Sequence, residues 1–234
     1  MAERIDPPGR TKGDAAHAIA KAAIGSLPVV GAAGAELFAY VVQAPYERRR
    51  EAWMREIGDE ISDLRDNAGI DVEKLRDDPA FTDTVLSATQ AALRTRSESK
   101  RRALRNAVRN AAKPSAPEEG VRLTFIRLVD ELTEWHLGLL DLFRDPAKWF
   151  GSHEAPPANL SMGAPSAVVE AAFPMLRGRR DLYDQWWRDL HVRGLVTIDH
   201  LHTTMTGQGM MSPRLTPLGN QFVVFIQNQD APPG

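Results

Sequence analysis

Apolar positions recur every three or four residues along most of this chain, which is the period of an α-helix with one buried face. The clearest stripe runs through Trp53, Ile57, Ile61 and Leu64, with charged residues between them. Further helices are predicted over 82–112, which is one helix or two, and over 119–134, 135–143, 166–177 and 180–193. The pattern therefore predicts a mainly α-helical protein.

The pattern changes near the carboxyl end, where alternating and β-branched residues predict short strands. The two predicted strands are 196–204 and 222–226, and a loop with two glycines, 206–212, lies between them. Because helices over 132–143, 166–176 and 180–196 precede these strands, the order predicts a winged-helix-like α+β unit. Its β-structure is expected to be a small antiparallel hairpin.

Prolines and small polar residues divide the chain. Pro45 is expected to kink or end the helix that precedes it. The stretch KPSAPE at 113–118 cannot continue a helix, so we place a domain boundary there. The predicted organisation is a disordered lead over 1–13, a helical domain over 14–116, a helix plus winged-helix-like domain over 117–227, and a disordered tail over 228–234.

The least polar segment, 15–44, is rich in Ala and Gly and predicts a helical hairpin interrupted at Pro28. Its uncharged run between Lys21 and Glu36 is too short for the roughly 20 residues that span a bilayer. Two environments stay open: the inside of a helical bundle, which Ala-rich helices favour, and a membrane that the hairpin enters when triggered. The candidate membrane-contacting residues are Ile24, Leu27, Val29, Val30, Leu37 and Phe38.

The amino-acid composition excludes several kinds of chemistry. The 234 residues include no cysteine, which excludes disulfides, thiol nucleophiles and cysteine-ligated metals. The net charge is only −2, so no global field attracts nucleic acid or anionic lipid. No hydrolase, zinc-protease, P-loop or dinucleotide-binding motif is present, so we expect no enzymatic activity, cofactor or metal. Without a recognisable secretory signal, the expected location is the cytoplasm, with membrane association as a variant.

Three histidines are candidates for chemistry. His200 and His202 lie two residues apart and would share one face of a strand, but no third or fourth metal ligand is near them in the sequence. We interpret them as exposed histidines of the predicted wing. His136 follows Trp135 in an amphipathic helix, and we interpret it as a packing residue.

Positive charge is concentrated in 94–113, against the single acidic residue Glu98. Such a segment binds phosphates or anionic lipid headgroups, or it pairs with an acidic helix. The overall charge balance favours pairing with the helix that carries Asp59, Asp63 and Asp66. The candidate anion-contacting residues are Arg96, Lys100, Arg101, Arg102, Arg105 and Arg109.

The helix over 180–193 is the second candidate contact surface. The residues expected to point outward to a protein partner or DNA are Arg180, Tyr183, Trp187, Arg188 and His191. Asp181, Asp184 and Asp189 oppose a phosphate backbone, so a protein partner or a second copy is favoured over nucleic acid. One of the adjacent residues Trp186 and Trp187 is expected in the core, and the other either anchors a partner or packs on the upstream helical domain.

Several phrases resemble known bacterial families. Leu190, Gly194, Leu195 and Val196, followed by LTPLG at 215–219, resemble the third helix and returning wing strand of MarR-type regulators. The stretches RRREAWM, ALRNAVRNAAKPSAPEE and LVDELTEWHLGLLDLF are similar to a family of helical bacterial proteins. The whole chain resembles the abortive-infection alpha type, which joins an Ala/Gly-rich part to helices and an LTxLG phrase.

The abortive-infection resemblance implies a role in bacterial defence or stress, and it supplies no catalytic residue. We therefore expect a non-enzymatic effector that acts through protein contacts, with membrane activity through 15–44 as an added expectation. The alternative from a different class is a winged-helix transcriptional regulator that binds DNA.

Overall fold

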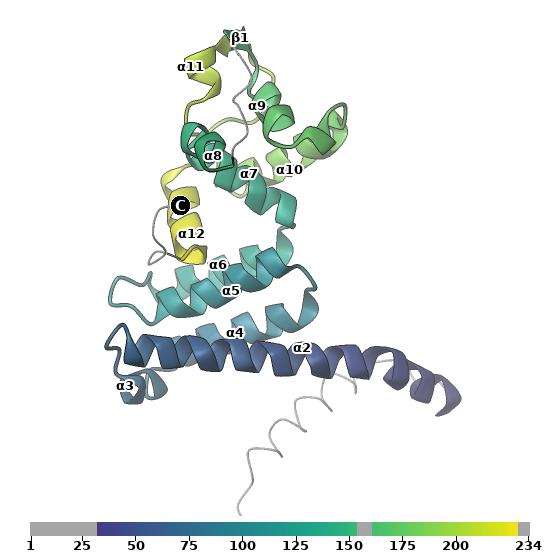
Figure 1. The fold of residues 1–234 in the computed structure, drawn as a ribbon, viewed down its shortest axis with the longest axis vertical. Helices are drawn as coiled ribbons and strands as arrows, with labels where there is room; N and C mark the ends of the chain where they lie inside the picture. The colour runs from purple at the N-terminus through teal and green to yellow at the C-terminus, as the bar shows by residue number, and fades with distance from the viewer. Residues whose placement is uncertain (1–31, 154–160, 229–234) are drawn as a thin grey trace, which may run out of the picture. The chain divides into compact units, whose positions relative to one another are not determined.

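The computed structural model describes residues 32–153 and 161–228 (Figure 1). These residues are mainly helical, with one small two-stranded antiparallel sheet, which confirms the predicted fold class. The chain separates into two compact units, 1–48 and 49–234. The predicted disordered lead over 1–13, the part of the predicted hairpin before residue 32 and all but the first residue of the predicted disordered tail over 228–234 lie outside the described residues.

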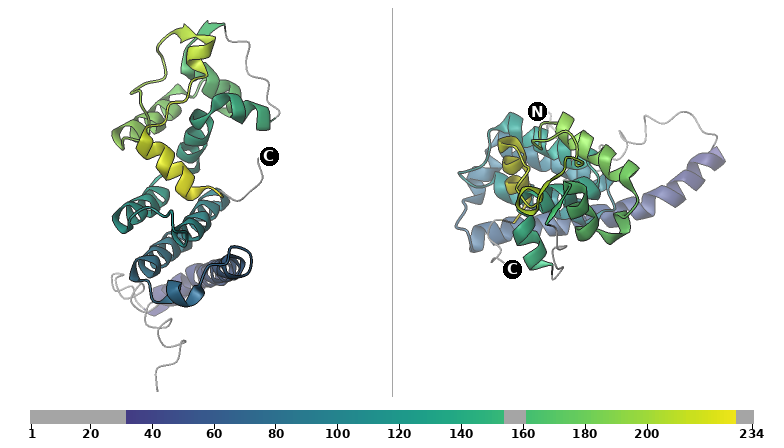
Figure 2. Two further views of the ribbon diagram at one scale, coloured as in Figure 1. Left: turned by 90° about the vertical axis from the view of Figure 1, so that its left-hand side faces the viewer. Right: turned by 90° about the horizontal axis from the view of Figure 1, so that it is seen from above.

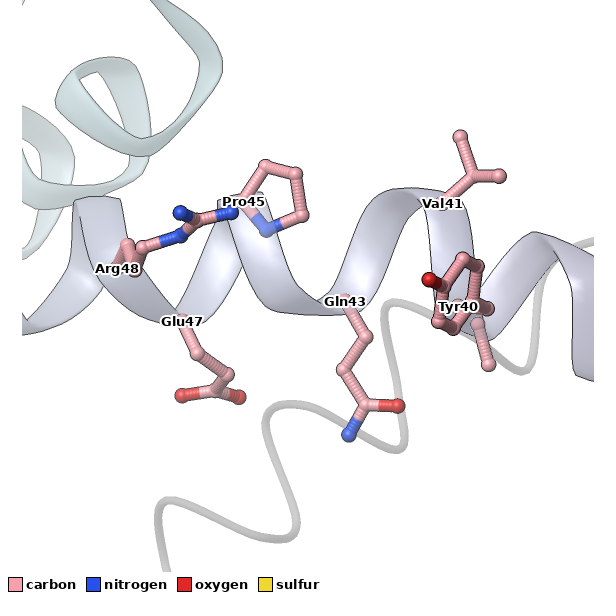
Figure 3. Close-up of a pocket in the computed structure, with 7 residues that line it drawn as sticks. Tyr40, Val41, Gln43, Pro45, Glu47 and Arg48 are labelled. Atoms are coloured by element: carbon pink, nitrogen blue, oxygen red, sulfur yellow. The ribbon is translucent and has the colours of Figure 1, made fainter.

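Helix α2 (Ala32–Asp66) begins in the first unit and continues into the second. It runs through Pro45, so the expectation that Pro45 ends a helix is wrong (Figure 3). A proline removes one backbone hydrogen bond from a helix, a loss that kinks or weakens the helix without always ending it. Beyond Pro45, the stripe residues Trp53, Ile57 and Leu64 are buried as predicted.

Local caps explain where the next helices begin. The side chains of Asp71, Asp78 and Ser97 accept hydrogen bonds from first-turn backbone N–H groups and start three helices. These are α3 (Val72–Arg76), α4 (Pro79–Arg94) and α5 (Glu98–Ala111). The region 82–112 is therefore two helices. Leu86 is 52% exposed, because the buried face of α4 runs through Phe81, Thr84, Ala88 and Ala91 instead.

Four of the remaining helices match predicted ones: α6 (Glu119–Glu131), α7 (Glu134–Arg144), α9 (Pro165–Ala172) with the 3-10 turn η1 (Pro174–Leu176), and α10 (Arg180–Val192). Three further helices lie outside the predicted ones: α8 (Pro146–Ser152), α11 (Gly207–Met210) and α12 (Pro217–Ile226). Helix α4 packs on both α5 and α6, and small buried residues such as Ala88 and Ala91 allow the close approach (Figure 2).

The strand over 222–226 is a wrong prediction, because these residues form the end of α12. The Thr216 side chain caps this helix by accepting from the Gly219 N–H at 3.0 Å, and Pro217 occupies its first turn. Phe222, Val223, Phe225 and Ile226 are buried together in its last turns. A short apolar run suits a buried helix face as well as a strand, so its composition did not decide between them.

The sheet is formed by other residues than predicted. Strand β1 (Met162–Gly163) pairs antiparallel with β2 (Met205–Thr206), and an isolated antiparallel bridge joins Val196 to Leu215. The predicted strand 196–204 is thus reduced to that bridge. The predicted loop 206–212 contains helix α11.

The core of the second unit continues across the domain boundary predicted at 116–117. Helix α12 packs on α5, where Asn106 Nδ2 donates to the Ile226 carbonyl at 3.0 Å. Asn110 Nδ2 donates to the carbonyls of Phe225 and Gln227, both at 2.9 Å. These two side chains satisfy carbonyls at the end of α12 that have no partner within the helix. Residues on both sides of the loop 113–118 therefore belong to one compact unit.

Candidate functional site on helix α2

The amino-terminal half of α2 exposes large apolar side chains. Leu37 is 66% exposed, Tyr40 is 84% exposed and Val41 is 64% exposed. Val42 is also exposed, to a smaller degree. Among the predicted membrane-contacting residues, Leu37 is the one whose side chain is described. Ile24, Leu27, Val29 and Val30 and the side chain of Phe38 lie outside the described residues.

These exposed side chains cover a broad part of the helix surface. Successive helical residues are rotated by about 100°, so the arc from Tyr40 through Leu37 and Val41 to Val42 spans roughly 200°. Residues 37–46 carry no formal charge. We call Leu37, Tyr40, Val41 and Val42 the apolar arc of α2.

Polar residues border the arc on its Tyr40 side, because Glu47 follows Tyr40 by seven residues and thus lies about 20° from it around the helix. Gln43 and Glu47 point to one side, whereas Val41 and Pro45 point to the opposite side (Figure 3). Three consecutive arginines, residues 48–50, follow in the sequence. The uncharged run over 37–46 is therefore followed by Glu47 and then by three arginines.

An arc of this width has two uses in proteins. A single partner helix covers a narrow seam of the kind seen in coiled coils, whereas a bilayer interface or a bundle of several helices covers a wider face. Within the described residues, no helix is both long enough and apolar enough to cross a membrane.

The basic residues of α5 are mostly neutralised by α2. Arg101 lies 3.5 Å from Glu56, Arg105 lies 3.7 Å from both Glu56 and Glu60, and Arg109 lies 2.5 Å from Asp63 and also pairs with Glu60. We call these six residues the α2–α5 ladder. The pairing predicted from charge balance is present, but it uses Glu56 and Glu60 in place of Asp59 and Asp66.

The other candidate anion-contacting residues are dispersed. Lys100 Nζ donates to the Asp130 carbonyl at 2.7 Å, and burial lowers the pKa of Lys100. Arg96 and Arg102 are both exposed. Two exposed arginines are fewer than the arginine and lysine clusters that bind nucleic acid.

On α10, two of the five expected contact residues are in the core. Tyr183 and Trp187 are buried, and Trp187 Nε1 donates to the Ile198 carbonyl at 2.9 Å, so the prediction that they face a partner is wrong. With Leu190 they form a stripe at positions i, i+4 and i+7 that faces inward. Arg180 and Arg188 are exposed, and Arg180 Nε lies 3.1 Å from Asp184.

The tryptophan next to the core tryptophan also packs within the protein. Trp186 is half-buried and stacks on Trp135 of α7, with ring centroids 5.4 Å apart and planes 4° apart. His191, the fifth expected contact residue, is half-buried with Nδ1 3.3 Å from the Val196 carbonyl. The described face of α10 therefore lacks an exposed aromatic anchor of the kind that dominates many protein interfaces.

The histidines take part in local contacts. His202 Nε2 lies 2.7 Å from Asp184 Oδ1, which fixes the loop before β2 to α10, and His200 is exposed. His136 is buried, and its Nδ1 accepts from the Thr133 backbone N–H at 3.1 Å. Burial lowers the pKa of His136, and the neighbouring Asp189 opposes this shift. No group of three candidate metal ligands occurs in the part of the chain that the structure describes.

We find no match to this chain among protein-family models, curated proteins or solved structures. The case for function therefore depends on the chain's own geometry. The predicted membrane-contacting residues include Leu37 of this arc but not Tyr40, Val41 and Val42. The uncharged run over 37–46 was the signal that could have found them.

Proposed function

We propose that this protein is a non-enzymatic bacterial effector that binds in the plane of a membrane surface through the amino-terminal half of α2. The observation that carries the proposal is the exposure of the apolar arc, residues Leu37, Tyr40, Val41 and Val42, directly before the arginines at 48–50. A helix with one apolar face and cations near its end lies at the boundary between headgroups and acyl chains. The proposed role in defence or stress comes from the resemblance to the abortive-infection alpha type and belongs to the same proposal.

The expected strength fits reversible binding. Burying one large aliphatic side chain contributes roughly 1.5–3 kcal/mol. Three or four such side chains give several kcal/mol, from which the cost of immobilising the protein is subtracted. The sum supports association with a surface that is weaker than insertion of a spanning helix.

Co-sedimentation of the full chain with vesicles tests this proposal. We expect binding to phosphatidylglycerol vesicles and weaker binding to phosphatidylcholine vesicles. The double variant Tyr40→Asp, Val41→Asp should bind at least about tenfold more weakly, because two charges would enter the acyl region. The matched control is Leu86→Asp, Val192→Asp, which changes two other exposed apolar residues and should bind like the wild type.

Two results would contradict the proposal: no sedimentation with either vesicle, or equal sedimentation of wild type and the Tyr40, Val41 variant. The defence role has a separate test, in which phage-challenged bacteria express the wild type or that variant. The culture that expresses the wild type should survive the phage, and the culture that expresses the variant should not.

The competing class, a winged-helix regulator, is favoured by one observation. Helices α7, α9 and α10 are followed by the antiparallel bridge between Val196 and Leu215, which matches the order of such domains. Acidic residues beside Arg180 and Arg188 oppose DNA binding. Salt-sensitive binding to duplex DNA that is lost in Arg180→Ala, Arg188→Ala would favour the regulator.

A further inference from the structure

A polar cleft lies where α7, α8 and α12 meet, within the second unit. Its volume is about 390 Å³, which is near the lower end for small-molecule sites. The residues that line it come from segments up to 86 positions apart in the sequence. Those that carry the argument are Asp141, Arg144, Asp145, Lys148, Trp149 and Gln227.

Gln227 holds two charged side chains of this cleft in place. Its Nε2 donates to Asp141 Oδ1 at 2.8 Å, and its Oε1 accepts from Arg144 Nη1. The amide thus contacts a carboxylate and a guanidinium without neutralising either one. Arg144 keeps further N–H donors, and Asp141 keeps acceptor positions, for another molecule.

The other two charged side chains of the cleft, those of Asp145 and Lys148, do not pair with each other. Asp145 Oδ1 accepts from the backbone N–H of Lys148 at 3.0 Å, and Lys148 is exposed to solvent. Among the described residues, Asp141, Arg144, Asp145 and Lys148 form no ion pair, although the α2–α5 ladder shows how readily this chain pairs its charges. Two cations and two anions that share a cleft without pairing are complementary to a ligand that carries both signs.

We propose that this cleft binds a small zwitterion of the size of a free amino acid. Its carboxylate contacts the Arg144 guanidinium, which presents a planar fork to such groups, and Lys148 adds a second cation. Its ammonium contacts Asp141 and Asp145. Trp149 forms an apolar part of the wall, where it also stacks on His153 with ring centroids 3.9 Å apart.

Titration calorimetry on the full chain tests the cleft. The probes are the free amino acids and glycine betaine, together with acetate and methylammonium as ligands of one charge. We expect at least one zwitterion to bind with a dissociation constant below about 1 mM, and both single-charge probes to bind at least about tenfold more weakly.

Two variants and one control assign the binding to the cleft. Lys148→Met and Asp141→Asn should each weaken binding about tenfold. The amide oxygen introduced by Asp141→Asn can still accept from Gln227, so the second variant removes the charge and keeps that hydrogen bond. Lys74→Met, which changes an exposed lysine of α3, should bind like the wild type. Circular dichroism checks that each variant is folded.

Three results would overturn the proposal: no zwitterion binds, acetate binds as strongly as the best zwitterion, or Lys148→Met has no effect. If Asp141→Asn does not fold, Lys148→Met still decides the matter, because Lys148 is exposed. The Tyr40→Asp, Val41→Asp variant should bind the zwitterion normally. Failure of the cleft and failure of membrane binding are therefore distinguishable.

Discussion

Gly219 shows how a single residue fixes the carboxyl-terminal part of the fold. A Cβ on Gly219 would lie 2.1 Å from the carbonyl oxygen of Leu195, well inside van der Waals contact. Beside it, Thr216 Oγ1 donates to the Gly194 carbonyl at 2.6 Å, and the Thr216 N–H donates to the Leu195 carbonyl at 3.0 Å. The LTPLG phrase therefore brings the start of α12 against the end of α10, a structural role that requires no activity.

We predict that Gly219→Ala destabilises the protein by about 2–4 kcal/mol, because the clash is with backbone that cannot move without displacing α12. Gly58→Ala is the matched control, since Gly58 lies in α2 with nothing within 4 Å of the added Cβ. The control should be more stable by about 0.5–1 kcal/mol, because alanine favours the helix interior. Urea unfolding at pH 7 measures both changes, and equal stability of Gly219→Ala and wild type would contradict the close approach.

At the scale of elements, the α2–α5 ladder joins two helices through pairs that are largely shielded from water. The side chains of Arg109 and Glu60 are only 12% and 13% exposed. Pairs in such positions are screened less than surface pairs, and each leaves an uncompensated partner when one side is removed. The ladder therefore contributes to holding this part of α2 on α5.

A double-mutant cycle with Glu60→Gln and Arg109→Gln should give a coupling energy of about 1 kcal/mol or more. The same cycle on the exposed pair Glu73 and Arg76 should give less than about 0.5 kcal/mol. Urea unfolding in low salt supplies the four stabilities for each cycle. If both cycles gave the same small coupling, the ladder would be only a solvated charged surface.

How well an element can be predicted from the sequence depends on how many residues its sequence signal extends over. Caps such as Asp78 and Ser97 locate helix starts, because they act on backbone groups within the same turn. Helix faces are less secure, since the arginines of α10 suggest a recognition face and thereby place Tyr183 and Trp187 outward. The i, i+4, i+7 spacing with Leu190 is the better guide.

The apolar arc and the polar cleft also differ in how far the sequence alone predicts them. The apolar segment of α2 is contiguous, so the sequence alone identifies it, without knowledge of how exposed Tyr40 and Val41 are. The polar cleft joins Asp141 to Gln227, and nothing local to either residue signals that they meet. Sites built by tertiary packing in this manner need the structure.

At the scale of the whole molecule, the two sides of the loop 113–118 share one core. Helix α4, which precedes the loop, packs on α6, which follows it. The asparagines of α5 satisfy carbonyls at the end of α12. A chain that begins at residue 117 would expose these carbonyls and the apolar face of α12 that packs on α5.

We therefore predict that a fragment over 117–228 does not fold, whereas a fragment over 49–228 unfolds in one cooperative transition. Each lost partner of a buried carbonyl costs about 1–3 kcal/mol, and total stabilities are commonly about 5–15 kcal/mol, so losing α5 removes a large share. Thermal unfolding followed by circular dichroism and by tryptophan fluorescence measures this, with coincident transitions expected for 49–228. Independent, cooperative folding of 117–228 would instead establish a domain boundary at the proline-containing loop, because it would show that the contacts of α12 with α5 are an interface between two separately stable units.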